Sequence, residues 1–168
     1  MKAREILGLA AIDSERGDAL GSVKGFIIDL EKRSIVALEV SGGFLSSSKV
    51  LPFNNIKALE QDVVMVPSAH SFINRRDLGF TGLTDRLTGR QVLTEDGRRL
   101  GDVRDYSFDV QSGDITTITF GVDKEVLGGL WKTAGDEYEI SASYIKTLGE
   151  NIIVDNSVPE ETGMNKAA

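Results

Sequence analysis

The chain repeats itself at a spacing of 80 residues, and this repeat constrains the fold more than any other feature. Residues 20–40 align with residues 100–120 without a gap, and most apolar positions of one copy are apolar in the other. Five aligned pairs are identical: Leu20 and Leu100, Gly21 and Gly101, Val23 and Val103, Asp29 and Asp109, and Ile35 and Ile115. A repeat of this length indicates two copies of one folding unit rather than a solenoid, whose units are shorter and more numerous.

The repeat divides the 168 residues into two domains of similar size. Its alignment extends outwards through small insertions in glycine-rich or charged segments, where a surface loop accepts extra residues at little entropic cost. We therefore predict a first domain over residues 1–68 and a second over residues 84–156. Residues 69–83 are expected to form a short ordered linker. Residues 157–168 are polar and aperiodic, which predicts a disordered tail.

Each copy has the residue pattern of β structure. Tyr106, Phe108 and Val110 alternate with polar neighbours, and alternation with period two is typical of a half-buried strand. A four-residue turn candidate and a strand rich in β-branched residues follow in each copy. Residues 53–59 and 143–148 are each expected to contain one short helical turn. We predict an all-β protein of two tandem small barrels, each with five or six short strands, because closure removes exposed sheet edges.

Composition excludes several classes of protein. The chain has no cysteine, which excludes disulfides, Cys-ligated zinc and thiol chemistry. No apolar run approaches the length of about 18 residues that a membrane helix needs, so we expect no membrane span. The opening segment resembles a signal peptide only faintly, and its counterpart in the second copy has the pattern of an ordinary strand. The expected location is therefore the cytoplasm.

Charge is distributed unevenly between the two copies. Residues 1–80 hold 10 basic and 10 acidic side chains, whereas residues 81–168 hold 9 basic and 16 acidic ones. An acidic second domain repels a phosphate backbone, which disfavours nonspecific binding of nucleic acid. The neutral first domain would contact RNA only through a local patch, and its basic pairs are typical of solvated turns.

Residues for a catalytic centre are scarce. His70 is the only histidine and falls in the predicted linker, so a Ser-His-Asp triad or a histidine metal site has little to build on. Gly128-Gly129 is followed by Leu-Trp rather than by the Lys-Ser or Lys-Thr of a phosphate-binding loop. The acidic clusters do not match a calcium-loop series. We expect no enzyme activity, no cofactor and no metal.

Two glycines and two aspartates recur at the same places in both copies. Gly21 and Gly101 are expected to adopt positive φ or to bend their strands sharply. Asp29 and Asp109 precede a hairpin turn, where a carboxylate can cap backbone N–H groups. A metal or catalytic role is the alternative, but no second acid recurs beside either aspartate at a fixed spacing. The repeat therefore favours a structural role as turn and cap residues.

A Gly-Gly pair followed by two large apolar residues also recurs. The apolar residues are Phe44 and Leu45 in the first copy and Leu130 and Trp131 in the second. They either fold back over the core or form an exposed apolar patch that docks a partner or a second copy of the chain. Both interpretations remain open, and the four residues are the candidate partner-docking site.

Residues 20–29 and residues 100–109 together resemble the PRC-barrel family. The family hallmark is a Leu-Gly-x-Val-x-Asp-like strand that ends in Asp and leads into a turn and an apolar strand. Arg104-Asp105 fits this pattern, whereas Lys24-Gly25 departs from it in the first copy. The resemblance covers about 150 residues in two copies, and it implies two tandem PRC-type barrels that are small and highly curved.

The family's known members suggest, but do not define, a role for this chain. They include the cytoplasmic part of the photosynthetic reaction-centre H subunit and the C-terminal domain of a ribosome-maturation factor that binds a small-subunit ribosomal protein. This chain is most similar to the tandem, soluble members. We expect a non-catalytic adaptor or scaffold that binds protein partners. The alternatives are a ribosome- or RNA-associated factor and a sensor that binds a small ligand or a metal.

Overall fold

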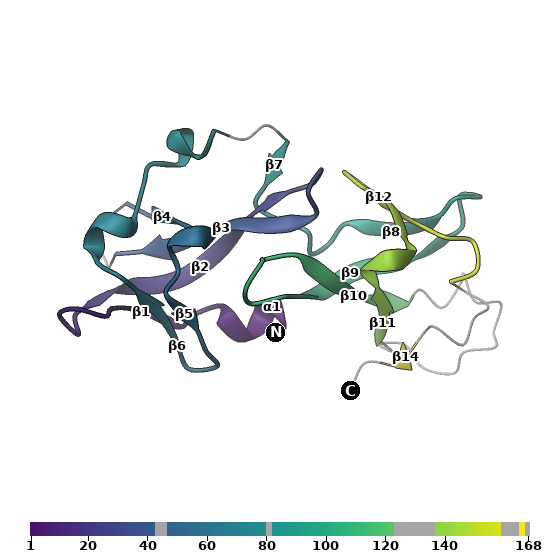
Figure 1. Cartoon of the computed structure of the whole chain (residues 1–168). Helices are drawn as coiled ribbons and strands as arrows, with labels where there is room; N and C mark the ends of the chain where they lie inside the picture. Colours follow the sequence, from purple (N-terminus) through teal and green to yellow (C-terminus); the bar gives the residue numbers. More distant parts are fainter. Residues whose placement is uncertain (43–46, 80–81, 123–136, 159–164, 167–168) are drawn as a thin grey trace. The chain divides into compact units, whose positions relative to one another are not determined.

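Two compact units make up the described part of the chain. The computed structural model describes residues 1–42, 47–79, 82–122, 137–158 and 165–166 (Figure 1). Unit 1 contains Met1–Arg86 together with Asp109–Asp114, and unit 2 contains Leu87–Phe108 and Ile115–Ala168. Each unit is built around one β-sheet, so the predicted all-β class and tandem organisation are confirmed.

Unit 1 is a sheet with short helical elements before and between its strands. The strands are β1 (Ala10–Asp13), β2 (Ala19–Asp29), β3 (Ser34–Ser41), β4 (Lys49–Pro52), β5 (Ala58–Leu59), β6 (Val63–Val66) and β7 (Leu83–Thr84). The helical elements are α1 (Ala3–Ile6), η1 (Phe53–Asn55), η2 (Ala69–Ser71) and η3 (Arg75–Leu78). The strand order is β4-β3-β2-β1-β6-β5, and β7 pairs with β2. Strands β1 and β6 are parallel, and the other neighbours are antiparallel.

Unit 2 has the same kind of sheet. Its strands are β8 (Gln91–Thr94), β9 (Arg99–Phe108), β10 (Ile115–Val122), β11 (Glu137–Ser141), β12 (Ile145–Leu148), β13 (Ile152–Val154) and β14 (Asn165–Lys166), with η4 (Ala142–Tyr144) between β11 and β12. The strand order is β12-β13-β8-β9-β10-β11-β14. Strands β8 and β13 are parallel, and the other neighbours are antiparallel.

The two sheets share one topology. The order β5-β6-β1-β2-β3-β4 in unit 1 matches β12-β13-β8-β9-β10-β11 in unit 2, and the parallel pair occupies the same place in both. Elements η1 and η4 follow matching strands, where the sequence predicts a helical turn. The six shared strands agree with the predicted five or six. Strands β7 and β14 add a two-residue pairing to each described sheet.

The repeated apolar positions form the core of each unit. Val23 and Val103, which are identical in the repeat, each expose 1% of their surface. Leu38 and Ile118 occupy equivalent places in β3 and β10, and both are fully buried. Burying one such side chain contributes about 1.5–3 kcal/mol. The repeated apolar residues therefore form two equivalent cores, one in each unit.

The repeated glycines hold backbone conformations that other residues rarely adopt. The φ angle is 143° at Gly21 and 155° at Gly101. A Cβ added to Gly21 would lie 2.1 Å from the carbonyl oxygen of Ser41, at the end of β3. Only glycine allows β2 to pass this close to β3.

The segment predicted to be a linker packs on unit 1 instead. Residues 69–79 and 82–86 form what we call the strap. The Ile73 amide donates to the Val50 carbonyl at 2.8 Å, and the Val50 amide donates to the Ile73 carbonyl at 3.3 Å. Leu78 is buried, and β7 pairs with the end of β2. The strap belongs to unit 1 because its few apolar side chains pack against the sheet of unit 1.

Part of the predicted tail is also ordered. Val158 exposes 2% of its surface, and its amide donates to the Asp155 carbonyl at 3.2 Å. Strand β14 pairs with β11 through the registers Tyr138–Lys166 and Glu139–Asn165. These described residues of the region 157–168 therefore take part in the fold of unit 2.

Candidate functional site

The predicted docking residues are not part of the described structure. Phe44, Leu45, Leu130 and Trp131 all lie outside the described residues. Their role as a partner-docking site stays a prediction.

The repeated aspartates cap the hairpin turns. The Asp29 Oδ1 atom accepts hydrogen bonds from the amides of Glu31 and Lys32, both at 3.0 Å. The Asp109 Oδ1 atom accepts from the amides of Ser112 and Gln111, at 2.9 and 2.8 Å. These N–H groups, with Ser112 first, hold the pKa of Asp109 below its ordinary value. Each carboxylate fixes the backbone of its turn, as in an Asx-turn.

The strap covers an apolar cluster that is peculiar to unit 1. Ile27, Ala37 and Val50 form this cluster with Leu78 of the strap. The strap also contributes Ile73 and Leu83, which pack against it. The strap stays packed on the sheet because this packing buries apolar side chains that would otherwise be exposed to water.

The equivalent positions in unit 2 are polar. Ser107, Thr117 and Glu139 stand in the repeat where Ile27, Ala37 and Val50 stand in unit 1. The two units thus share a core but present different sheet faces. On this face, unit 1 carries apolar residues that pack against the strap.

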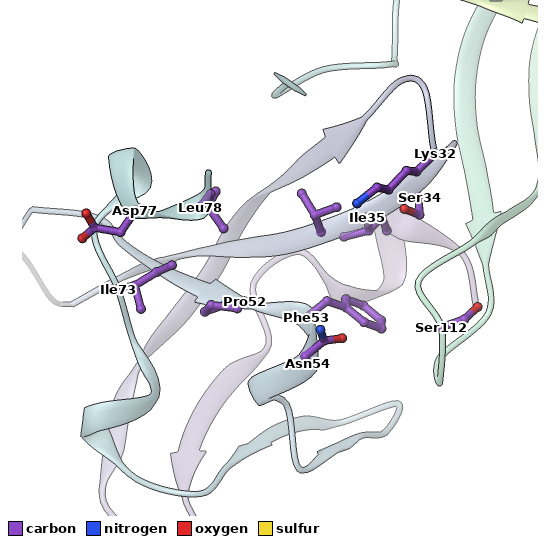
Figure 2. A pocket seen from close by; sticks show the side chains of 11 residues that line it. Lys32, Ser34, Ile35, Pro52, Phe53, Asn54, Ile73, Asp77, Leu78 and Ser112 are labelled. Carbon is purple, nitrogen blue, oxygen red and sulfur yellow. The ribbon is translucent and has the colours of Figure 1, made fainter. Parts of the chain in front are cut away.

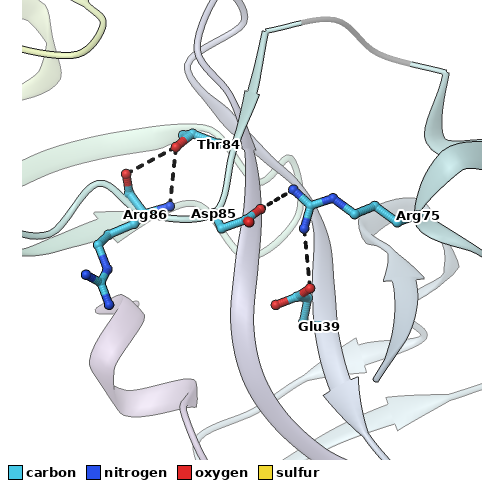
Figure 3. A network of polar contacts seen from close by, with 5 residues as sticks. All are labelled: Glu39, Arg75, Thr84, Asp85 and Arg86. Atoms are coloured by element: carbon cyan, nitrogen blue, oxygen red, sulfur yellow. Dashed lines mark hydrogen bonds and ion pairs between the residues drawn. The ribbon is translucent and has the colours of Figure 1, made fainter. Parts of the chain in front are cut away.

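A polar network connects the strap to β3 and links residues within the strap (Figure 3). The Arg75 guanidinium donates to Glu39 of β3 at 3.4 Å and to Asp85, and the bond to Asp85 raises the pKa of Arg75. The Thr84 hydroxyl donates to the carbonyl of Arg86 at 3.3 Å and accepts from its amide at 3.4 Å. The Arg75 ion pairs are partly exposed, so we expect each to contribute at most about 1 kcal/mol.

A pocket of about 300 Å³ opens between the strap and the sheet of unit 1 (Figure 2). Asp77 and Leu78 lie at the end formed by the strap, and Lys32 and Ser34 lie at the opposite end. This first pocket is lined by Lys32, Ser34, Ile35, Val36, Pro52, Phe53, Asn54, Ile73, Asp77, Leu78 and Ser112. A pocket of this size is at the lower limit of small-ligand sites.

A second pocket lies beside the first. Its volume is about 440 Å³, and it shares Phe53 and Asn54 of η1 with the first pocket. The second pocket is lined by Phe53, Asn54, Ile56, Lys57, Ala58, Leu59, Glu60, Val110 and Gln111. We call the two pockets together the Phe53 groove.

The groove combines apolar walls with neutral polar groups. Phe53 and Asn54 line both pockets, and Phe53 is buried whereas Asn54 is exposed. Ser34, Ser112 and Gln111 add hydroxyl and amide groups to the lining. Such a surface can bury apolar side chains and hydrogen-bond to a partner's backbone.

Sequence reasoning missed this groove. It placed Phe53 and Asn54 in a helical turn but gave them no surface role. The only signal is a large aromatic residue followed by polar residues directly after an apolar strand. The groove also needs the strap and the turn Asp109–Asp114, which are far from η1 in the sequence and join it only in the fold.

A metal site, a histidine-based site and a membrane span each have requirements against which the described residues can be compared. Within the described ranges, no group of three or more His, Asp or Glu side chains is placed to hold a metal ion. His70 lies exposed in η2, where its amide donates to the Ser68 hydroxyl at 3.3 Å. No helix among the described residues has the length and apolar character needed to cross a membrane.

Comparison with known protein families gives a clear match. The model of the PRC-barrel domain matches residues 1–72 and, a second time, residues 83–159. The two matches agree with the two sheets and with the repeat. No curated protein matches the chain.

Proposed function

This chain belongs to the PRC-barrel family, and from that premise we propose that it is a non-catalytic adaptor or scaffold that binds protein partners. In this proposal unit 1 docks a partner through the Phe53 groove. Unit 2 supplies a second, more polar surface on the same scaffold. The proposed location is the cytoplasm. Its reducing conditions do not affect a chain without cysteine, which forms no disulfide.

One observation carries the proposal. The Phe53 groove joins two pockets on one unit, and apolar and neutral polar residues make up most of its lining. Protein-binding surfaces combine an apolar centre with a polar rim that hydrogen-bonds to the partner. A catalytic site would instead be expected to gather groups with strongly shifted pKa values in one cleft.

A charge placed at the centre of the groove tests the proposal. Asn54 is exposed and shared by both pockets, so Asn54→Arg fills the groove without removing a core side chain. Gln61→Arg adds the same charge at an exposed position of unit 1 that lines neither pocket. Wild type and both variants are used as affinity baits and compared by quantitative mass spectrometry.

The proposal predicts proteins that are lost with Asn54→Arg and retained with Gln61→Arg. Circular dichroism and thermal unfolding confirm that both variants remain folded. Identical sets of captured proteins for all three baits would contradict docking in the groove.

A further inference from the structure

The shape of the Phe53 groove indicates what kind of segment it accepts. We propose that the groove binds an extended, uncharged peptide segment that carries two apolar side chains separated by one residue. This inference rests on the proposed function. Because both pockets share Phe53 and Asn54, they are adjacent. In an extended chain, residues i and i+2 point to the same side, so a segment of this kind would present both apolar side chains to the two adjacent pockets.

Charge in the groove is balanced. The first pocket is lined by Lys32 and Asp77, and the second by Lys57 and Glu60. The Lys57 ammonium donates to the Ser14 hydroxyl at 3.1 Å, and the Lys32 ammonium lies 4.0 Å from the Asp29 carboxylate. A polyanion or a polycation would meet repulsion in each pocket as well as attraction. An uncharged segment meets neither, so the charge pattern favours it.

Neutral polar groups along the groove suit a peptide backbone. Asn54 and Gln111 carry side-chain amides, each of which both donates and accepts hydrogen bonds. Ser34 and Ser112 add hydroxyl groups at the first pocket. A peptide bound in extended form presents alternating N–H and C=O groups, which need partners when water is excluded.

The apolar surface of the groove is partly open to solvent. Val110 exposes 39% of its surface at the second pocket. Val36 and Ile73 at the first pocket and Ile56 at the second are half-buried. A bound apolar side chain in each pocket would cover these residues, and burial of apolar area drives such docking.

Two matched peptide pools test the spacing. Both are fluorescent decapeptides of Ser, Gly, Thr and Asn with two positions randomised among Val, Leu and Phe. The first pool places the apolar residues at positions 4 and 6, and the second at positions 4 and 5, where an extended chain points them to opposite sides. Fluorescence anisotropy measures binding to the full chain, and amide chemical shifts from nuclear magnetic resonance locate the bound peptide.

The proposal predicts at least tenfold tighter binding of the first pool, with shifted amides at Asn54, Lys57 and Ser112. Asn54→Arg should weaken this binding tenfold or more, and Gln61→Arg should leave it unchanged. Equal binding of both pools at the groove would overturn the spacing while leaving protein docking intact. Binding of neither pool, or displacement of the peptide by a single-stranded RNA oligonucleotide, would overturn the inference. The affinity comparison with protein baits then decides separately whether the groove docks a protein.

Discussion

The close approach at Gly21 makes the sharpest stability prediction. Replacing Gly21 with alanine puts a Cβ 2.1 Å from the Ser41 carbonyl oxygen and 2.9 Å from a methyl carbon of Val40. Real Cβ atoms essentially never come this close to another atom, so β2 and β3 must separate locally. Forcing an extra carbon into a packed site costs about 1–3 kcal/mol.

The backbone angle at Gly21 adds a second cost. Its φ of 143° lies in a region that is almost restricted to glycine, where another residue costs about 1–3 kcal/mol. The two costs together predict a loss of about 2–6 kcal/mol, a large share of the roughly 5–15 kcal/mol that stabilises a typical domain. Gly21→Ala should therefore leave unit 1 marginally folded.

Gly17→Ala is the matched control. Gly17 also has positive φ, at 75°, but no atom lies within 4 Å of its added Cβ. Only backbone strain of about 1–2 kcal/mol applies there. Urea denaturation followed by circular dichroism compares the two variants, with the slope m checked for constancy. If Gly21→Ala loses no more stability than Gly17→Ala, the close packing of β2 on β3 at this position is wrong.

Three further predictions concern the strap and the charged groups. Leu78→Ala should destabilise unit 1 by about 2 kcal/mol in urea denaturation, because it opens the covered apolar cluster; an unchanged midpoint would show that the strap adds nothing. Arg75→Ala should cost under about 2 kcal/mol in the same assay, because it removes two partly exposed ion pairs; a larger loss would contradict this. Hydrogen bonds from Ser157 and contact with Lys146 lower the folded pKa of Asp155 to about 2, below an unfolded value of about 3.9. The stability from Asp155 is thus present above about pH 4 and is lost as pH falls towards 2. Thermal unfolding across this range should show a shallower decline for Asp155→Asn, and parallel curves for the two proteins would refute the assignment.

The sequence alone predicts the sheets well because their signal is doubled. The identical Val23 and Val103, and the glycines 80 residues apart, mark equivalent strands in both copies. Tertiary structure then places these strands in one shared order. A duplicated pattern is strong evidence because each copy acts as a check on the other.

The strap is hard to predict from sequence for a physical reason. Ile73, Leu78 and Leu83 are spaced irregularly among polar residues and glycines, so no helical or strand period joins them. Their packing depends on Ile27 and Ala37, which lie on distant strands. The contrast with polar Ser107 and Thr117 in the second copy is the only sequence clue to the covered face.

The Phe53 groove is hidden from sequence reasoning in the same way. Phe53 has the pattern of a core residue and is indeed buried, while its neighbour Asn54 has the pattern of a turn. The pockets exist because Asp77 of the strap and Val110 of a remote turn complete their walls. The spacing of these residues along the chain does not indicate that they line the same groove in the fold.

Site-specific photo-crosslinking tests the central claim of protein docking most directly. A photoreactive phenylalanine analogue replaces Asn54 in one variant and Gln61 in another, and both full-length chains are irradiated in living cells. The account predicts a discrete crosslinked protein at Asn54 that is absent at Gln61 and is displaced by excess unmodified wild-type chain. The same products at both positions, or none at Asn54 in a folded variant, would contradict docking through the groove.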